Sequence, residues 1–193
     1  MNHNPKAMAL SIVHLILMIG ALGLSCISLF TYDLSAQGTP LVLSKIWNIA
    51  AIFASVFGFA YFFAGYRKSA AVLYRIFLAL FTLVLVLENI SAMVSSETPL
   101  LYSIVLALTP VIAVVLVVAK DLGERKSSLL GGAMVLLRLV AVIVAFVQPQ
   151  PGLSAAAATG MQLQLLAALL LCACAGLMVA AKYYNKNLRG AAV

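Results

Sequence analysis

The chain has 193 residues, of which 65% are hydrophobic and only 9% are charged, and its formal net charge is +7. A soluble domain averages about half apolar and about a quarter charged residues, and so few charges cannot cover a water-exposed globule of this size. The composition therefore excludes an ordinary cytosolic enzyme, a disordered chain and a nucleic-acid-binding domain, and it indicates a polytopic membrane protein.

Six continuous apolar runs follow one another along the chain, each near the ~20 residues that an α-helix needs to cross ~30 Å of hydrocarbon. In chain order, the predicted helices cover residues 7–30, 46–66 (with 41 as an alternative start), 70–94, 100–119, 129–147 and 153–181. Continuous runs favour helices over barrel strands, whose apolar residues alternate. The first run is longer than the apolar core of a signal peptide, so we interpret it as a helix. We predict an all-α fold, a six-transmembrane-helix bundle that forms a single membrane domain over residues 1–193.

The distribution of basic residues predicts the orientation of this bundle. Cytoplasmic segments of membrane proteins are enriched in Lys and Arg. Ten of the twelve basic residues fall in the two tails, in two of the breaks, and at the start of the third run: Lys6, Arg67, Lys68, Arg75, Lys120, Arg125, Lys126, Lys182, Lys186 and Arg189. These segments share one side when six helices alternate across a bilayer, so we expect both termini in the cytoplasm. The same bias, with the short connections, favours the plasma membrane of a bacterium.

Arg138 is the most informative single residue because it follows the start of the fifth run by nine positions and so lies near the bilayer midplane. A centred Arg costs at least ~2.5 kcal/mol on insertion scales, and such a residue should face the bundle interior and have a partner. The functional interpretation is an anion-binding or charge-pairing group in a central pocket. The alternative is a structural ion pair or a side chain that extends toward an interface.

Glu88 is the natural partner to consider for Arg138. At 1.5 Å per residue, Glu88 lies ~27 Å from the cytoplasmic end and Arg138 ~15 Å, a gap that is long for a direct pair unless the helices tilt or their starts are misjudged. The alternative places Glu88 with Asn89, Asn48 and Lys45 in a polar group at the outer mouth, and Gln162 and Gln164 enter the sixth run from the same side. This group is either an entrance for a small ligand or ordinary interfacial solvation.

Small residues recur every four positions in two of the predicted helices, and such stripes let membrane helices approach closely. The stripes consist of Ala50, Ala54 and Gly58 in the second run and of Ala168, Cys172 and Gly176 in the sixth. We interpret them as packing surfaces within the bundle, with the docking of a partner subunit as the alternative. Pro110 lies inside the fourth run, where the missing N–H predicts a helix kink.

The sequence contains no phosphate-binding loop, no nucleophile elbow, no paired carboxylates, and no cluster with metal-ligand spacing. We therefore expect no enzymatic activity, no metal and no cofactor. Two function classes remain: a small-solute-binding membrane transport component, or a non-transporting accessory or interaction subunit of the assembly or immunity type. The expected partners are the lipid bilayer, a small-molecule ligand, and a protein subunit or a second copy of the chain, but not nucleic acid.

In size and topology the chain resembles the six-helix substrate-binding subunits of energy-coupling-factor vitamin importers. Those subunits usually carry an Ala-x-x-x-Ala motif in the first helix, with which they dock their partner. At that spacing this sequence has Ala7 and Ser11, which departs from the motif. The resemblance implies a substrate-binding role beside a separate energy-coupling subunit.

Overall fold

The structure, a computed structural model, describes residues 5–35, 39–65, 68–94, 100–118, 124–147 and 155–190. These residues form six α-helices and one short 3-10 turn, and the described part contains no strand. The elements in chain order are α1 (Pro5–Ser35), α2 (Thr39–Phe63), η1 (Lys68–Ala70), α3 (Ala71–Val94), α4 (Leu100–Val118), α5 (Glu124–Val147) and α6 (Ala155–Gly190). The predicted all-α bundle of six helices is confirmed.

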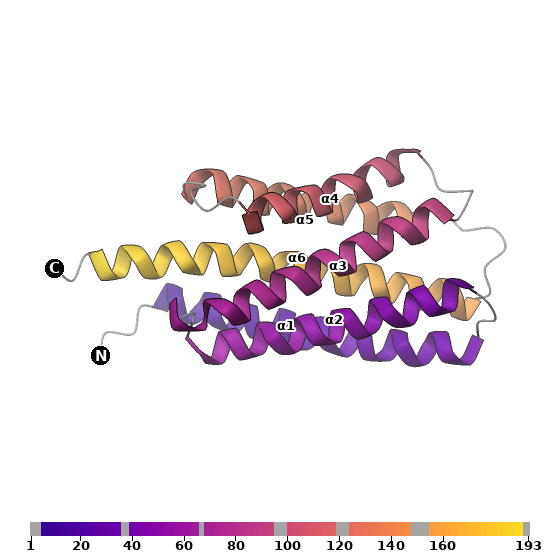
Figure 1. The fold of residues 1–193 in the computed structure, drawn as a ribbon, viewed down its shortest axis with the longest axis horizontal. Coiled ribbons are helices and arrows are strands. Elements are labelled where there is room, and N and C mark those ends of the chain that lie inside the picture. Colours follow the sequence, from indigo (N-terminus) through magenta and orange to yellow (C-terminus); the bar gives the residue numbers. More distant parts are fainter. Residues whose placement is uncertain are drawn as a thin grey trace.

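The helices form a closed ring in which each packs against the next along the chain and α6 returns to α1. Consecutive helices run in opposite directions, and α1 begins at the end of the bundle where α6 ends (Figure 1). In addition to its neighbours α1 and α5, α6 also contacts α2 and α3. α6, which contains the longest apolar run, thus closes the ring and lines its interior.

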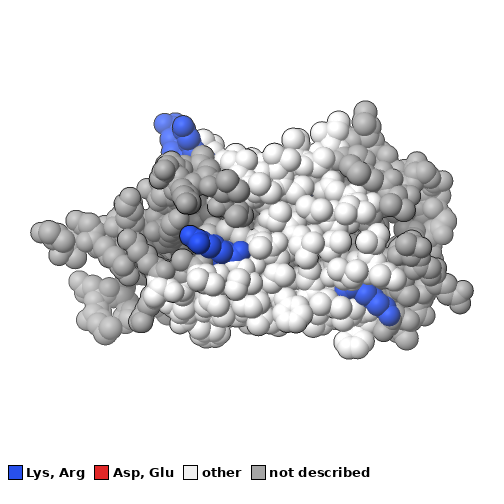
Figure 2. All heavy atoms as spheres, viewed as in Figure 1, with Lys and Arg blue, Asp and Glu red and all other residues white. Residues whose placement is uncertain are grey.

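Five helices are long and apolar enough to cross a membrane. Their candidate spans are Met8–Thr31, Val42–Phe63, Val72–Ile90, Arg125–Val147 and Ala158–Met178, and the described side chains of α4 add the shorter apolar segment Ala107–Leu116. Large apolar side chains cover the outside of the bundle, and Phe63 and Val147 are more than 70% exposed. Figure 2 shows a broad band without described charges, with Lys and Arg toward the ends of the molecule. An outer surface of this kind is stable in lipid, so the chain is a multi-pass membrane protein.

The helices differ in extent from the predicted apolar runs. α2 begins at Thr39 and not at residue 46, with Pro40 in the first turn, where its missing N–H breaks no helix hydrogen bond. α5 begins at Glu124, five residues before the predicted start, and α6 continues nine residues beyond residue 181 to Gly190. An apolar run measures only the length of helix that suits hydrocarbon, and helical hydrogen bonding can continue beyond it. The good helix formers Glu124, Arg125 and Lys126 extend α5 in this way.

Candidate functional site: a charge pair inside the bundle

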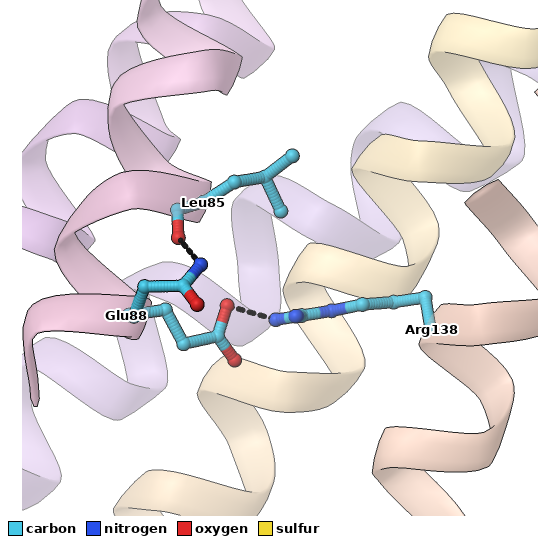
Figure 3. A network of polar contacts seen from close by, with 4 residues as sticks. Leu85, Glu88 and Arg138 are labelled. Atoms are coloured by element: carbon cyan, nitrogen blue, oxygen red, sulfur yellow. Dashed lines mark hydrogen bonds and ion pairs between the residues drawn. The ribbon is translucent and has the colours of Figure 1, made fainter. Parts of the chain in front are cut away.

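Arg138 on α5 and Glu88 on α3 form an ion pair in the interior of the bundle, in which Arg138 Nη2 donates to Glu88 Oε2. Figure 3 shows the extended Arg138 side chain pointing from its helix toward the Glu88 carboxylate. The Arg138 side chain is 1% exposed and the Glu88 side chain is 11% exposed. Among the described Lys, Arg, Asp and Glu residues, Arg138 is the only one that is fully buried.

The two side chains meet because α5 starts five residues before its predicted apolar run, whereas α3 starts within one residue of its own. Measured from the starts of their helices at Glu124 and Ala71, Arg138 lies ~21 Å along α5 and Glu88 ~26 Å along α3. The axial gap is then ~5 Å, which two long side chains span, and not the ~12 Å that the sequence implies. The error arose at α5, whose first five residues are polar and were left out of the predicted helix.

Two other helices enclose the pair, because α4 and α6 each pack against both α3 and α5. Cys172 on α6 is buried and lies near both Arg138 and Glu88. Met134, one turn before Arg138, and Leu85, one turn before Glu88, are also buried. The pair is therefore surrounded by apolar or weakly polar groups, where an unpartnered charge is very costly.

The carboxylate of Glu88 is only partly used by this pair. Its second oxygen, Oε1, is buried and has no hydrogen-bond partner among the described residues. The amide nitrogen of the neighbouring Asn89 donates to the Leu85 carbonyl of its own helix at 2.8 Å. Glu88 therefore keeps a buried acceptor for a further group.

A second polar cluster lies where α1, α2 and α6 meet, toward the end of the bundle opposite the start of α1. The Ser44 carbonyl accepts from Asn48 Nδ2 at 2.9 Å and from Gln164 Nε2 at 3.4 Å. Across the α1–α6 contact, Ser28 Oγ donates to the Gly160 carbonyl at 3.1 Å. This cluster ties three helices together with neutral hydrogen bonds.

The predicted polar group at the outer mouth is thus divided between two places. Glu88 joins Arg138, whereas Asn48 lies in the second cluster with Gln164. Gln162 is half-buried, and within the described part no hydrogen bond connects it to either place. Ser44, whose carbonyl accepts from both amides, is the polar residue that sequence reasoning did not select. The four-residue spacing from Ser44 to Asn48, a hydrogen-bonding distance on a helix, was the available signal.

The remaining selected residues lie close to these two places. The stripe residues Ala50, Ala54 and Gly58 are buried, as are Ala168 and Cys172, and Gly176 is half-buried. A Cβ added at Gly131 of α5 would lie 3.4 Å from Gly176 Cα, so α5 and α6 approach backbone to backbone there. Pro110 lies inside α4, next to the buried Thr109. α4 packs against α3 and α5, the two helices that carry Glu88 and Arg138.

The described residues contain no group of three or more His, Cys, Asp or Glu side chains that could hold a metal ion. Comparison of the chain with protein-family models, with curated proteins and with solved structures finds no match in any of the three. The charge pair and the polar cluster are therefore the features from which a function can be argued.

Proposed function

We propose that this protein is a small-solute-binding component of a membrane transport system and that its binding site is built on Arg138 and Glu88. The observation that carries the proposal is the ion pair itself, a full positive and a full negative charge inside an apolar bundle. Ionisable residues in membrane-spanning segments are costly, and they commonly mark solute or ion pathways. Packing alone is served equally well by two apolar side chains at these positions.

The chemistry of the pair suits a solute that carries an anionic group. The Arg138 guanidinium presents several N–H donors in a planar fork, which matches the geometry of a carboxylate or phosphate. Such a group can replace Glu88 as the partner of Arg138, and the released carboxylate then needs a cationic group or a proton. A zwitterion supplies both charges at once and leaves the interior neutral.

The arrangement of helices gives a route by which the pair could open. α4 packs against both α3 and α5, and Pro110 interrupts its hydrogen-bond ladder within the apolar segment. Bending of α4 at Pro110 would change its packing against α3 and α5, the two helices that carry the charges. We place the protein, as part of the same proposal, in the plasma membrane of a bacterium.

The test is native mass spectrometry of the protein extracted from its own host in a mild detergent. We expect the wild-type chain to retain a small molecule, Arg138→Leu to lose it, and Arg125→Leu to keep it. Arg125 is the matched control because it lies on the same helix and is exposed. If wild type retains no small molecule, or if Arg138→Leu retains it equally well and only becomes more stable, the proposal is wrong.

A protein partner retained without any small molecule would instead support the accessory-subunit alternative. The small-residue stripes do not supply the docking surface that this alternative needs, because their residues pack inside the chain's own bundle. A docking surface would have to come from other residues.

A further inference from the structure

Two side chains on facing helices carry buried, complementary hydrogen-bonding atoms that nothing in the described part of the chain satisfies. Trp47 on α2 is 3% exposed, and its Nε1–H has no acceptor among the described residues. Glu88 on α3 holds Arg138 with Oε2, while its buried Oε1 has no donor among them. A buried polar atom without a partner costs ~1–3 kcal/mol, and more where the atom is charged.

The register of α2 against α3 places these two residues opposite one another. Near the other end of the helix pair, the rings of Tyr61 and Tyr74 are in contact, with centroids 5.3 Å apart. Trp47 lies fourteen positions before Tyr61, and Glu88 lies fourteen positions after Tyr74. Fourteen residues make ~3.9 turns and ~21 Å of helix, which returns each chain to nearly the same face. α2 and α3 pack together and run in opposite directions (Figure 1). Helix geometry therefore brings the two residues to the same level on facing sides.

The chemistry of the two atoms restricts what can bind between them. The indole N–H can only donate, and the ionised carboxylate oxygen can only accept. A bridging group must therefore accept from Trp47 and donate to Glu88 at the same time. A carboxylate cannot donate and an ammonium cannot accept, whereas a hydroxyl does both.

We propose that a hydroxyl oxygen, either of a water molecule or of a hydroxyl-bearing solute, binds between Trp47 Nε1 and Glu88 Oε1. This group lies beside the Arg138–Glu88 pair and completes the hydrogen bonding of the carboxylate. In its solute form the inference rests on the proposed function, and it adds that the solute carries a hydroxyl group. If the hydroxyl belongs to water, the inference does not depend on the proposed transport function.

The experiment uses the fact that Trp47 is the single tryptophan of the chain, so the protein has one indole N–H resonance. The full-length, 15N-labelled protein is studied by NMR in lipid nanodiscs, first alone and then with glycerol as the hydroxyl-bearing probe. A cross-peak between the indole proton and water identifies water as the source. A saturable shift of the indole resonance with glycerol shows that a solute hydroxyl occupies the site.

Two variants connect the signal to Glu88. Glu88→Gln removes the charged acceptor, and we expect the apparent affinity for glycerol, or the occupancy by water, to fall about tenfold with the loss of a charge-assisted hydrogen bond. Thr82→Val is the matched control on α3, because Thr82 Oγ1 donates only along its own helix, to the Leu78 carbonyl at 2.8 Å. This control should leave the indole resonance and its cross-peak unchanged.

The wild-type spectrum decides the question even if Glu88→Gln does not fold. An indole resonance that shows no cross-peak to water and no response to glycerol overturns the inference. So does a signal that Glu88→Gln and Thr82→Val leave equally unchanged. If native mass spectrometry finds a small molecule that depends on Arg138 while the indole signal stays silent, the proposed function stands and the hydroxyl site does not exist. If a water cross-peak is seen but no small molecule is retained, the hydroxyl site exists and the proposed function is wrong.

Discussion

At the scale of single residues, the Arg138–Glu88 pair has an asymmetric energetic role. Removal of one partner leaves the other charge buried and uncompensated, which costs about 3–5 kcal/mol, whereas replacement of both by apolar residues is often neutral. We expect Arg138→Leu and Glu88→Leu each to lower the free energy of unfolding strongly, and the double variant to recover most of the loss. Thermal unfolding of all four proteins in one detergent measures this coupling. Additive losses in the double variant would mean that the two side chains do not pair in the membrane.

Gly58 sits at the contact of three helices and allows no side chain without movement of its neighbours. A Cβ at this position would meet Met18 of α1 and come within 3.3 Å of Met178 of α6. We expect Gly58→Val to destabilise the bundle by about 1–3 kcal/mol, and Gly58→Ala by less because thioether chains are flexible. Gly23 is the matched control, since a Cβ there meets nothing within 4 Å among the described residues, and Gly23→Ala should not lower the melting temperature. Equal losses at the two positions would argue against this packing.

At the scale of the helix, α5 and α6 approach one another closely at Gly131 and Gly176. A Cβ at Gly131 already contacts the backbone of α6, so the further methyl groups of a valine press against a backbone that cannot rearrange as a side chain can. We expect Gly131→Val to lower the melting temperature and to weaken ligand retention, because Arg138 lies two turns further along the same helix. The adjacent Gly132 is exposed, with nothing within 4 Å of an added Cβ, so Gly132→Val serves as the control. A similar response of the two variants in thermal unfolding and native mass spectrometry would contradict the observed packing.

The helices themselves could be predicted from hydrophobicity, but the contacts between them could not. Apolar runs indicate where a chain lies in hydrocarbon, and all six appear as helices in the structure. The pairing of Arg138 with Glu88 depends on where α5 starts, and residues 124–128 carry no hydrophobic signal that would reveal that start. The position of Trp47 opposite Glu88 depends on the α2–α3 register, which the tyrosine contact fixes and composition does not. Arg138 was selected correctly as a buried charge because a midplane Arg has few alternatives.

At the scale of the whole molecule, the number of helices and the placement of charge lead to one orientation. The exposed residues Arg75, Arg125 and Lys126 lie near the starts of α3 and α5, at the end of the bundle where α1 starts and α6 ends (Figure 1). Lys45, near the start of α2, is at the opposite end. Positively charged ends of membrane helices are retained in the cytoplasm, so the start of α1 and the end of α6 should both face it.

Cysteine labelling with a membrane-impermeant maleimide tests this orientation. Ser69 lies in η1, between α2 and α3, and Ala155 is the first residue of α6, and both are exposed. We expect Ala155→Cys to react in intact cells and Ser69→Cys to react only after the membrane is made permeable. The native cysteines are buried or half-buried, so the wild-type chain gives the background. The reverse pattern would place the basic end outside, and the Arg138–Glu88 pair would then lie nearer to the cytoplasmic surface. A solute that reaches the pair would enter from the cytoplasm, and the proposed system would have to export it.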